Sequence, residues 1–161
     1  RVDVIATTRG VVEQYRPDAR SAGIALSLQA SDAPLPATLD ASALHRILAN
    51  VLDNALKFSP SGGTVTVRVT DATDAVRVEI ADTGIGIDPA FLDRIFEPFE
   101  QESTGLRRSH EGVGIGLAVT QHLVRLMNGT IAVDSTPGEG TTVTVHLPSH
   151  GKHGSSSRSS R

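Results

Sequence analysis

Apolar residues recur at helical spacing through residues 41–58, and this stretch gives the strongest local signal in the chain. Its apolar positions share one broad arc, which predicts a helix packed on a core: Leu44, Ile47, Leu48, Val51, Leu52 and Ala55. Asp40 is placed to cap the start of this helix, and the run from Ser59 to Gly63 ends it.

Two further helices are expected on either side of it. Residues 2–20 carry a looser helical pattern, closed by Pro17 and Gly23, and its early start is expected of a piece of a longer protein. The stretch from Val113 to Met127 also reads as a helix, stopped by Asn128 and Gly129. Asp88 followed by Pro89 predicts a short helix that reaches about Phe96.

Alternation of apolar and polar residues predicts the strands. The strand segments are Ile24–Leu28, Thr64–Thr70, Ala75–Ala81, Thr130–Asp134 and Thr141–Leu147. Helices and strands interleave, but tight turns join several of the strands. We therefore expect an α/β fold with a mixed sheet and helices on one of its faces.

Composition narrows the class of protein. The chain has 161 residues, enough for one domain with a core, and 39% of them are hydrophobic. A net charge of −3 argues against a general nucleic-acid or membrane-surface binder. The absence of cysteine excludes disulfides, thiolate metal sites and a cysteine nucleophile. No apolar run reaches the roughly 20 residues that cross a bilayer.

The helix 41–58 also carries a polar stripe. Asn50, Asn54 and Lys57 fall at i, i+4 and i+7, with Asp53 beside them. A solvated helix face would explain charged residues here, but asparagine in the middle of a helix lowers helix propensity. Amide oxygens suit Mg²⁺, which completes its shell with waters and phosphate oxygens, and a lysine one turn on suits the same phosphates.

Two glycine runs are the second source of candidate chemistry. Asp82 ends a strand and begins the run Asp-Thr-Gly-Ile-Gly-Ile, where a carboxylate can accept from the exocyclic amino group of adenine. The run Gly-Val-Gly-Ile-Gly-Leu at 112–117 opens a helix, whose first N–H groups form an anion site. A dinucleotide fold requires such a run after the first strand, and a Walker A loop requires Gly-Lys-Ser/Thr, so neither applies.

Five motifs in order resemble the N, G1, F, G2 and G3 boxes of sensor histidine kinases. They are Asn50-x3-Asn54-x2-Lys57, Asp82-x-Gly84-x-Gly86, Phe96-Glu-Pro-Phe99, Gly112-x-Gly114-x-Gly116 and Gly138-x-Gly140-Thr141. The chain is similar to the ATP-binding catalytic domain of that family, within the GHKL ATPase superfamily. The resemblance implies a two-layer α/β sandwich: a mixed, mostly antiparallel sheet covered on one face by about three helices, with a mobile ATP lid over residues 100–111.

The resemblance also implies a role for each matched residue. Asn54 would coordinate Mg²⁺, with Asn50 and Lys57 near the phosphates as the other catalytic residues. Asp82 would hold the adenine amino group, Thr141 would support it, and Gly84 and Gly86 would let the base approach. Further nucleotide contacts are expected from Ile87, Phe96, Phe99, Arg108, Gly112, Gly114, Ile115, Gly116 and Leu117. We expect residues 54 and 82 to line a shared cavity.

The sequence departs from the family pattern in the lid. Glu111 stands where glycine is usual and Val113 where threonine is common. Ser109-His110-Glu111 looks like a phosphoacceptor site, but Gly112 follows at once, so His110 is interpreted as a lid residue. His45, His122 and His146 are interpreted as structural.

The resemblance implies a Mg²⁺-ATP-dependent protein-histidine kinase module, residues 1–148, followed by a disordered or non-native tail at 149–161. Its γ-phosphate would pass to a histidine on a dimerisation and phosphotransfer domain of the same protein, and then to a response-regulator receiver domain. We expect a cytoplasmic monomer that touches neither nucleic acid nor membrane. A hydrolytic GHKL ATPase and a partner-binding domain without nucleotide affinity are the alternatives.

Overall fold

The computed structural model describes residues 1–97 and 113–150. Five strands form the main sheet: β2 (Ala25–Gln29), β4 (Thr64–Ala72), β5 (Ala75–Asp82), β6 (Thr130–Thr136) and β7 (Gly140–Pro148). Their order is β2-β4-β5-β7-β6. The β2 and β4 strands are parallel, and every other neighbouring pair is antiparallel. The predicted mixed, mostly antiparallel sheet is confirmed.

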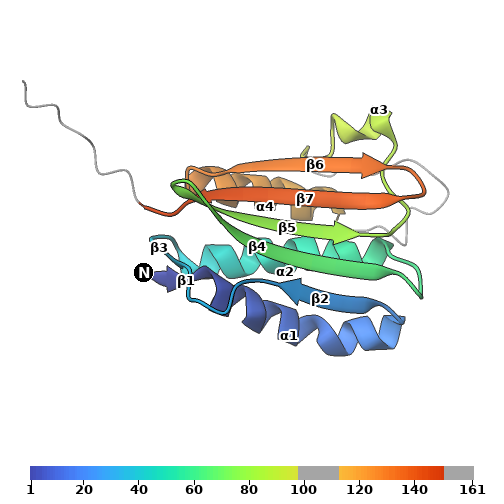
Figure 1. Ribbon diagram of the computed structural model, residues 1–161. Helices are drawn as coiled ribbons and strands as arrows, with labels where there is room; N and C mark the ends of the chain where they lie inside the picture. Colours follow the sequence, from blue (N-terminus) through green and yellow to red (C-terminus); the bar gives the residue numbers. More distant parts are fainter. Residues whose placement is uncertain (98–112, 151–161) are drawn as a thin grey trace, which may run out of the picture.

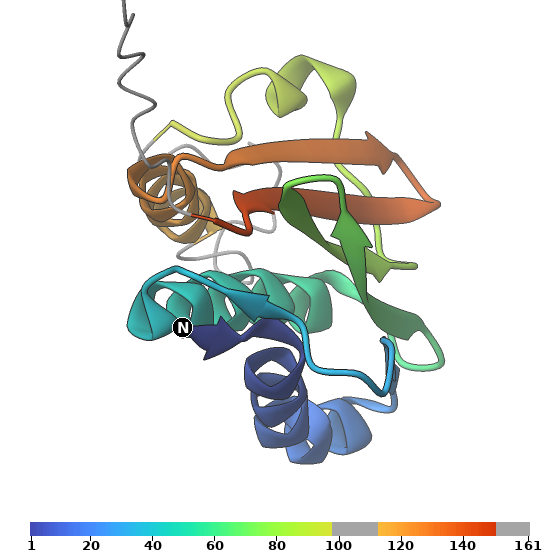
Figure 2. The same ribbon diagram turned by 60° about the vertical axis from the view of Figure 1, so that its left-hand side comes forward.

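Helices α1 (Val4–Ala22), α2 (Ala41–Phe58) and α4 (Val113–Leu126) cover one face of this sheet, as expected. Figure 1 shows α2 and α4 behind the strands, and Figure 2 shows the same helices from a second direction. The short helix α3 (Pro89–Leu92) lies apart, against β6 at the end of the sheet. The molecule therefore has two layers.

The core fills the space between these layers. Alternate residues of the central strands point into it and are buried: Val65, Val67, Val69, Val76, Val78, Ile80, Val143, Val145 and Leu147. The apolar arc of α2 meets them, and all six of its predicted core residues are buried. The opposite face of the sheet is polar, with Arg68 and Glu79 paired across β4 and β5 at 3.2 Å.

The bounds of α2 agree with the sequence pattern. Asp40 caps its first turn, accepting from the Ala43 amide at 3.0 Å, and Ser59 has extended backbone at its end. This agreement places Asn50, Asn54 and Lys57 on one long helix whose orientation is set by its buried arc.

The prediction for α1 was wrong in two places. Pro17 does not end the helix, which continues to Ala22 and closes at Gly23 in the left-handed conformation. Pro17 removes the helical partner of the Glu13 carbonyl, and both residues are exposed, where water can take the place of the missing donor. Val2 and Asp3 are not helical either: they form β1 (Val2–Asp3), which pairs with β3 (Pro36–Ala37).

Two other boundaries differ. The helix expected from Asp88 to about Phe96 is regular only over α3, where the Asp88 side chain accepts from the Ala90 amide, and turns follow it. At the other end, Ser149 was expected in the tail but is buried. Its carbonyl accepts from Thr38 and its amide donates to Asp74, so the folded part includes it.

Candidate functional site

One cavity opens between α2, the end of β5 and the segment that follows it. Asn54 and Asp82 both line this cavity, although 28 residues of chain (54 to 82) separate them. The other lining residues are mostly apolar: Val51, Ala55, Phe58, Ile80, Ile85, Gly86, Ile87, Phe91, Ile95, Leu117, Val133, Thr141 and Val143. A mostly apolar cavity with a few polar groups is typical of a small-molecule site.

Asp82 is fixed by backbone on two sides. Its Oδ1 accepts from the Gly84 amide at 2.9 Å and from the Thr141 amide at 3.2 Å. Among the described residues, none donates to its Oδ2. One carboxylate oxygen therefore sets the orientation of the side chain, and the other can accept from a ligand.

Burial is the main influence on the charge of Asp82. Desolvation raises the pKa of this carboxyl above its ordinary value of 3.8, and the hydrogen bonds from Gly84 and Thr141 act in the opposite direction. A partly buried carboxylate in an apolar cavity is stabilised by any hydrogen-bond donor that a ligand brings, because water reaches the carboxylate poorly.

Asn54 brings an unsatisfied polar group to the same cavity. Its Nδ2 is buried and has no hydrogen-bond partner within the described part of the chain. Such a group costs about 1–3 kcal/mol unless something completes it. Because the two ends of an amide are assigned from their partners, a ligand could meet either the oxygen or the nitrogen here.

Asn50 and Lys57 lie on the same helix but do not line the cavity. The Asn50 amide donates to the Thr120 hydroxyl of α4 at 3.4 Å. Lys57 Nζ lies 2.9 Å from Asp53 Oδ2, and both side chains are about half exposed. The polar stripe predicted from the sequence is present, but only Asn54 turns into the cavity.

The glycines after Asp82 allow close packing of the protein on itself. A Cβ at Gly84 would overlap the Phe58 carbonyl, and one at Gly86, where φ is +73°, would overlap the Thr136 carbonyl. From the sequence, these two glycines are expected to let a base approach, and Gly86 does line the cavity. The nearest neighbours of an added Cβ are the end of α2 at Gly84 and the start of the β6–β7 turn at Gly86, so both glycines also pack the Asp82 segment against the rest of the protein.

A small apolar cluster forms the far wall. Phe91, Ile95 and Leu117 are buried in it, and Ile87 and Phe96 pack against them. The candidates Ile87 and Leu117 therefore line the cavity, whereas Phe96 supports its wall from behind. Phe91 and Ile95 were missed because nothing in their sequence context distinguishes them from ordinary core residues.

Several candidates cannot be placed. Phe99, Arg108 and Gly112 lie outside the described residues, as do the other lid positions. Gly114, Ile115 and Gly116 belong to the first turns of α4 by their backbone. Only the backbone of these three residues is among the described parts of the chain.

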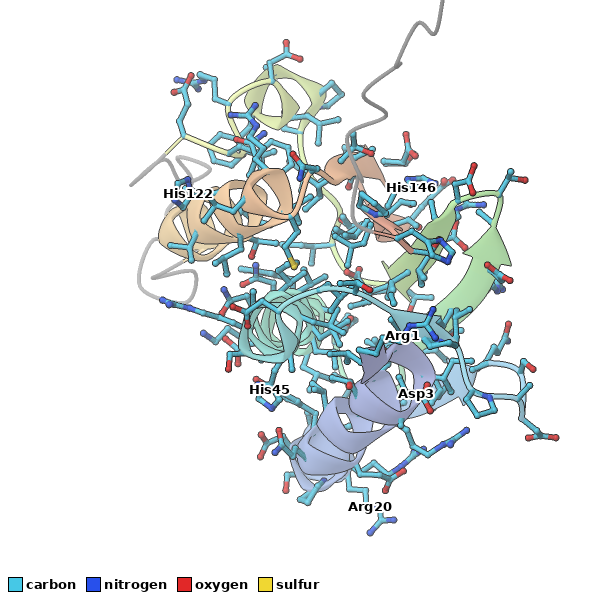
Figure 3. All side chains as sticks on the ribbon, turned by 90° about the vertical axis from the view of Figure 1, so that its left-hand side faces the viewer. Arg1, Asp3, Arg20, His45, His122 and His146 are labelled. Carbon is cyan, nitrogen blue, oxygen red and sulfur yellow. The ribbon has the colours of Figure 1, made fainter. Side chains whose placement is uncertain are left out.

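The histidines of the described residues form no second site. Figure 3 shows His45, His122 and His146 on three different elements, well apart from one another. His45 contacts Gln14 at 3.1 Å. Within residues 1–97 and 113–150, no group of three or more His, Asp or Glu side chains could hold a metal ion. No helix in this part of the chain is long and apolar enough to cross a bilayer.

Similarity to known proteins identifies the family of this chain. The family model described as histidine kinase-, DNA gyrase B-, and HSP90-like ATPase matches residues 39–151. The chain belongs to this family. The matched region begins just before α2 and ends just after β7, so it holds every described residue that lines the cavity.

Named relatives place the chain on the histidine kinase side of the family. It is 38% identical over 120 residues to the sensor histidine kinase RcsC of Escherichia coli, covering 74% of this chain and 12% of that protein. The mycobacterial sensor histidine kinase MprB has a TM-score of 0.79 at 32% identity, covering 92% of this chain and 97% of that structure. Full-length ShkA, solved in complex with AMPPNP, has a TM-score of 0.79 at 34% identity, covering 91% of this chain and 30% of that one.

The chain spans 12% to 17% of the length of several curated relatives that it matches. It is an ATP-binding catalytic domain of the sensor histidine kinase type. The family and the two-layer α/β fold expected from the five motifs are confirmed, while the expected lid at residues 100–111 lies outside the described residues.

Proposed function

We propose that this chain binds Mg²⁺-ATP in the described cavity and donates the γ-phosphate to a histidine outside these 161 residues. The observation that carries the proposal is that Asn54 and Asp82 line one cavity, each with an unused polar atom. A carboxylate oxygen and an amide at separate places on one apolar cavity suit a ligand with an amino-bearing base and an anionic end.

The base is assigned to the Asp82 end. Oδ2 of Asp82 would accept from the exocyclic amino group of adenine, while guanine would present an oxygen and repel it. Thr141 lies beside Asp82 in the β5–β7 ladder and would complete this end. The apolar walls from Ile80, Ile87 and Val143 suit the faces of a purine ring.

The phosphates are assigned to the α2 and α4 end. The unpartnered end of the Asn54 amide is its Nδ2 as placed, and with the amide turned over its oxygen would serve Mg²⁺, which would neutralise charge on the phosphates. Asn50 and Lys57 lie along the same helix, and Lys57 would exchange Asp53 for a phosphate. Gly112, Gly114 and Gly116 would present backbone N–H groups at the start of α4. The nucleotide analogue held by ShkA supports this proposal by likeness.

A kinase is favoured over a hydrolytic ATPase. Hydrolysis needs a base that takes a proton from water, and an amide such as Asn50 cannot do so near neutral pH. In the transfer reaction the histidine nitrogen supplies the electron pair, a phosphorus–nitrogen bond forms, and ADP leaves. The residues of this chain only bind and orient the nucleotide, which is the main source of catalysis in phosphoryl transfer.

The partners follow from this role. The acceptor histidine belongs to a dimerisation and phosphotransfer domain of the same protein, and a receiver domain takes the phosphate afterwards. We further propose a cytoplasmic location, a catalytic domain at residues 1–148 extended by the packed Ser149, and a tail without a role in catalysis.

Labelled ATP tests the proposal. The chain alone should bind Mg²⁺-ATP and retain no label, but label should appear on a histidine hairpin from the same protein when it is added. Steady release of phosphate by the chain alone, with no transfer to the hairpin, would support the ATPase instead. Failure to bind ATP would support the partner-binding alternative.

A further inference from the structure

Ser135 of β6 joins the two protein segments that carry the base end of the cavity. Its hydroxyl accepts from the Ile87 amide at 2.8 Å, donates to the Gly140 carbonyl at 3.0 Å and lies 2.8 Å from the Thr141 hydroxyl. Ile87 and Thr141 line the cavity, whereas Ser135 does not. We propose that Ser135 is a positioning residue for purine selection, an inference that rests on the proposed nucleotide function.

The hydrogen-bond capacity of Ser135 determines the direction of the protons. A serine hydroxyl donates one proton and accepts at two lone pairs. All three contacts are satisfied together only when Thr141 donates its proton to Ser135, because Ser135 gives its own to Gly140. Thr141 lines the cavity, and its hydroxyl then has only lone pairs to offer a ligand there.

This arrangement makes the base end an acceptor surface. Thr141 is the register partner of Asp82, and its amide holds Asp82 Oδ1. With its proton directed at Ser135, Thr141 adds a second acceptor beside the free Oδ2 of Asp82. Two adjacent acceptors favour a base edge that donates, as the amino group of adenine does, and disfavour an edge that accepts.

Ser135 also fixes the segment on the other side of the base. The Ile87 amide has Ser135 as its partner, and the Gly138 amide donates to the Ile85 carbonyl at 2.8 Å nearby. Without the Ser135 hydroxyl, the Ile87 amide loses its partner and the Thr141 hydroxyl is free to turn its proton toward the base. Both changes reduce selection for an amino group.

A purely structural role predicts something different. Loss of three hydrogen bonds would lower the melting temperature but would leave the folded protein with the same preference among bases. The ratio of affinities for ATP and for inosine triphosphate, which has an oxygen in place of the amino group, separates the two roles.

The experiment measures both affinities by calorimetry on the whole chain with Mg²⁺. Ser135→Ala should weaken ATP binding about tenfold and change inosine triphosphate binding less, so the ratio shrinks. Ser135→Thr keeps a hydroxyl and should keep the ratio. Thr130→Ala removes an exposed hydroxyl from the same strand and should also keep it.

A double-mutant cycle adds an independent readout. Thr141→Val alone should reduce the ratio, and in the Ser135→Ala background it should have little further effect, since the two hydroxyls act together. A folded Ser135→Ala chain with the wild-type ratio, an additive cycle, or an equal loss in Ser135→Thr would overturn the Ser135 assignment. A wild-type chain that does not bind ATP would instead refute the proposed function.

Discussion

Asp82 and Thr141 face each other across the β5–β7 ladder, and the Thr141 amide donates to Asp82 Oδ1 at 3.2 Å. The bond crosses 59 residues of sequence and leaves Oδ2 of Asp82, a residue that lines the cavity, without a donor in the described chain. The orientation of the carboxylate is therefore determined before any ligand arrives, and a ligand need not spend free energy ordering it.

The variant Asp82→Asn tests the burial of this carboxyl through the way the free energy of unfolding depends on pH. Burial raises the pKa of Asp82 above 3.8, so the folded state binds its proton more tightly than the unfolded state does. The free energy of unfolding therefore falls as pH rises from about 3.8 through the raised pKa. Asp82→Asn has no such loss and should gain stability relative to wild type across that window.

Urea denaturation at a series of acidic pH values measures the difference between the two proteins. Asp3 titrates with the opposite sign because its Leu35 hydrogen bond lowers its pKa, but it is present in both proteins and cancels. A difference that stays constant with pH would contradict the buried state of Asp82.

Asn54 should be more important for binding than for folding. Asn54→Ala removes a buried group that has no partner, so the free energy of unfolding should stay the same or rise. The same change should abolish the part of the ATP affinity that depends on Mg²⁺. Calorimetry with Mg²⁺ and with a chelator measures that part, and an unchanged metal dependence would remove Asn54 from the metal site.

Gly138, in the turn between β6 and β7, and Gly140, the first residue of β7, make a matched pair. At Gly140 φ is +129°, and a Cβ there would overlap the Asp82 carbonyl, whereas at Gly138 φ is +80° and the space around a Cβ is open. Gly140→Ala should cost on the order of 3 kcal/mol or more, and Gly138→Ala about 1–2 kcal/mol. Equal losses in chemical denaturation would show that the Asp82 contact is not tight.

Some of this architecture could be predicted from the sequence because the signals are local. Helix α2 has a capping aspartate, a continuous apolar arc and a Pro-Gly stop, so its bounds agreed at both ends. The prediction for α1 failed at Pro17, because whether proline breaks a helix depends on where the lost carbonyl faces. That orientation is a tertiary property. The pairing of β1 with β3 also depends on partners more than 30 residues apart.

The candidate site was predictable to a similar degree. Asp82 stands out because this carboxylate ends a strand and begins a glycine run. Asn54 stands out because it is an amide in the middle of a helix. Ser135 carries no such signal: it is one polar residue in an alternating strand, and only the folded chain brings its hydroxyl to Ile87 and Thr141. Contacts between distant segments are what sequence patterns alone do not contain.

The Asp53–Lys57 pair predicts an effect of ionic strength. The two side chains are exposed, so their pairing contributes little to stability, and Asp53 competes with phosphate for Lys57. Asp53→Asn should tighten ATP binding by about two- to fivefold at low salt and less at high salt. Glu13→Gln removes the same charge from a similar pair on α1 and should change nothing. No change in Asp53→Asn at any salt concentration would exclude Lys57 from the phosphate site.

Calorimetric comparison of ATP, ADP and GTP with Mg²⁺ on the whole chain tests the shared cavity most directly. ATP should bind more tightly than GTP by at least about tenfold, because adenine presents its exocyclic amino donor to Asp82 where guanine presents a carbonyl oxygen. In Asp82→Asn this preference should be largely lost while the protein stays folded. Equal affinity for GTP, or an Asp82→Asn chain that keeps the preference for ATP, would contradict it.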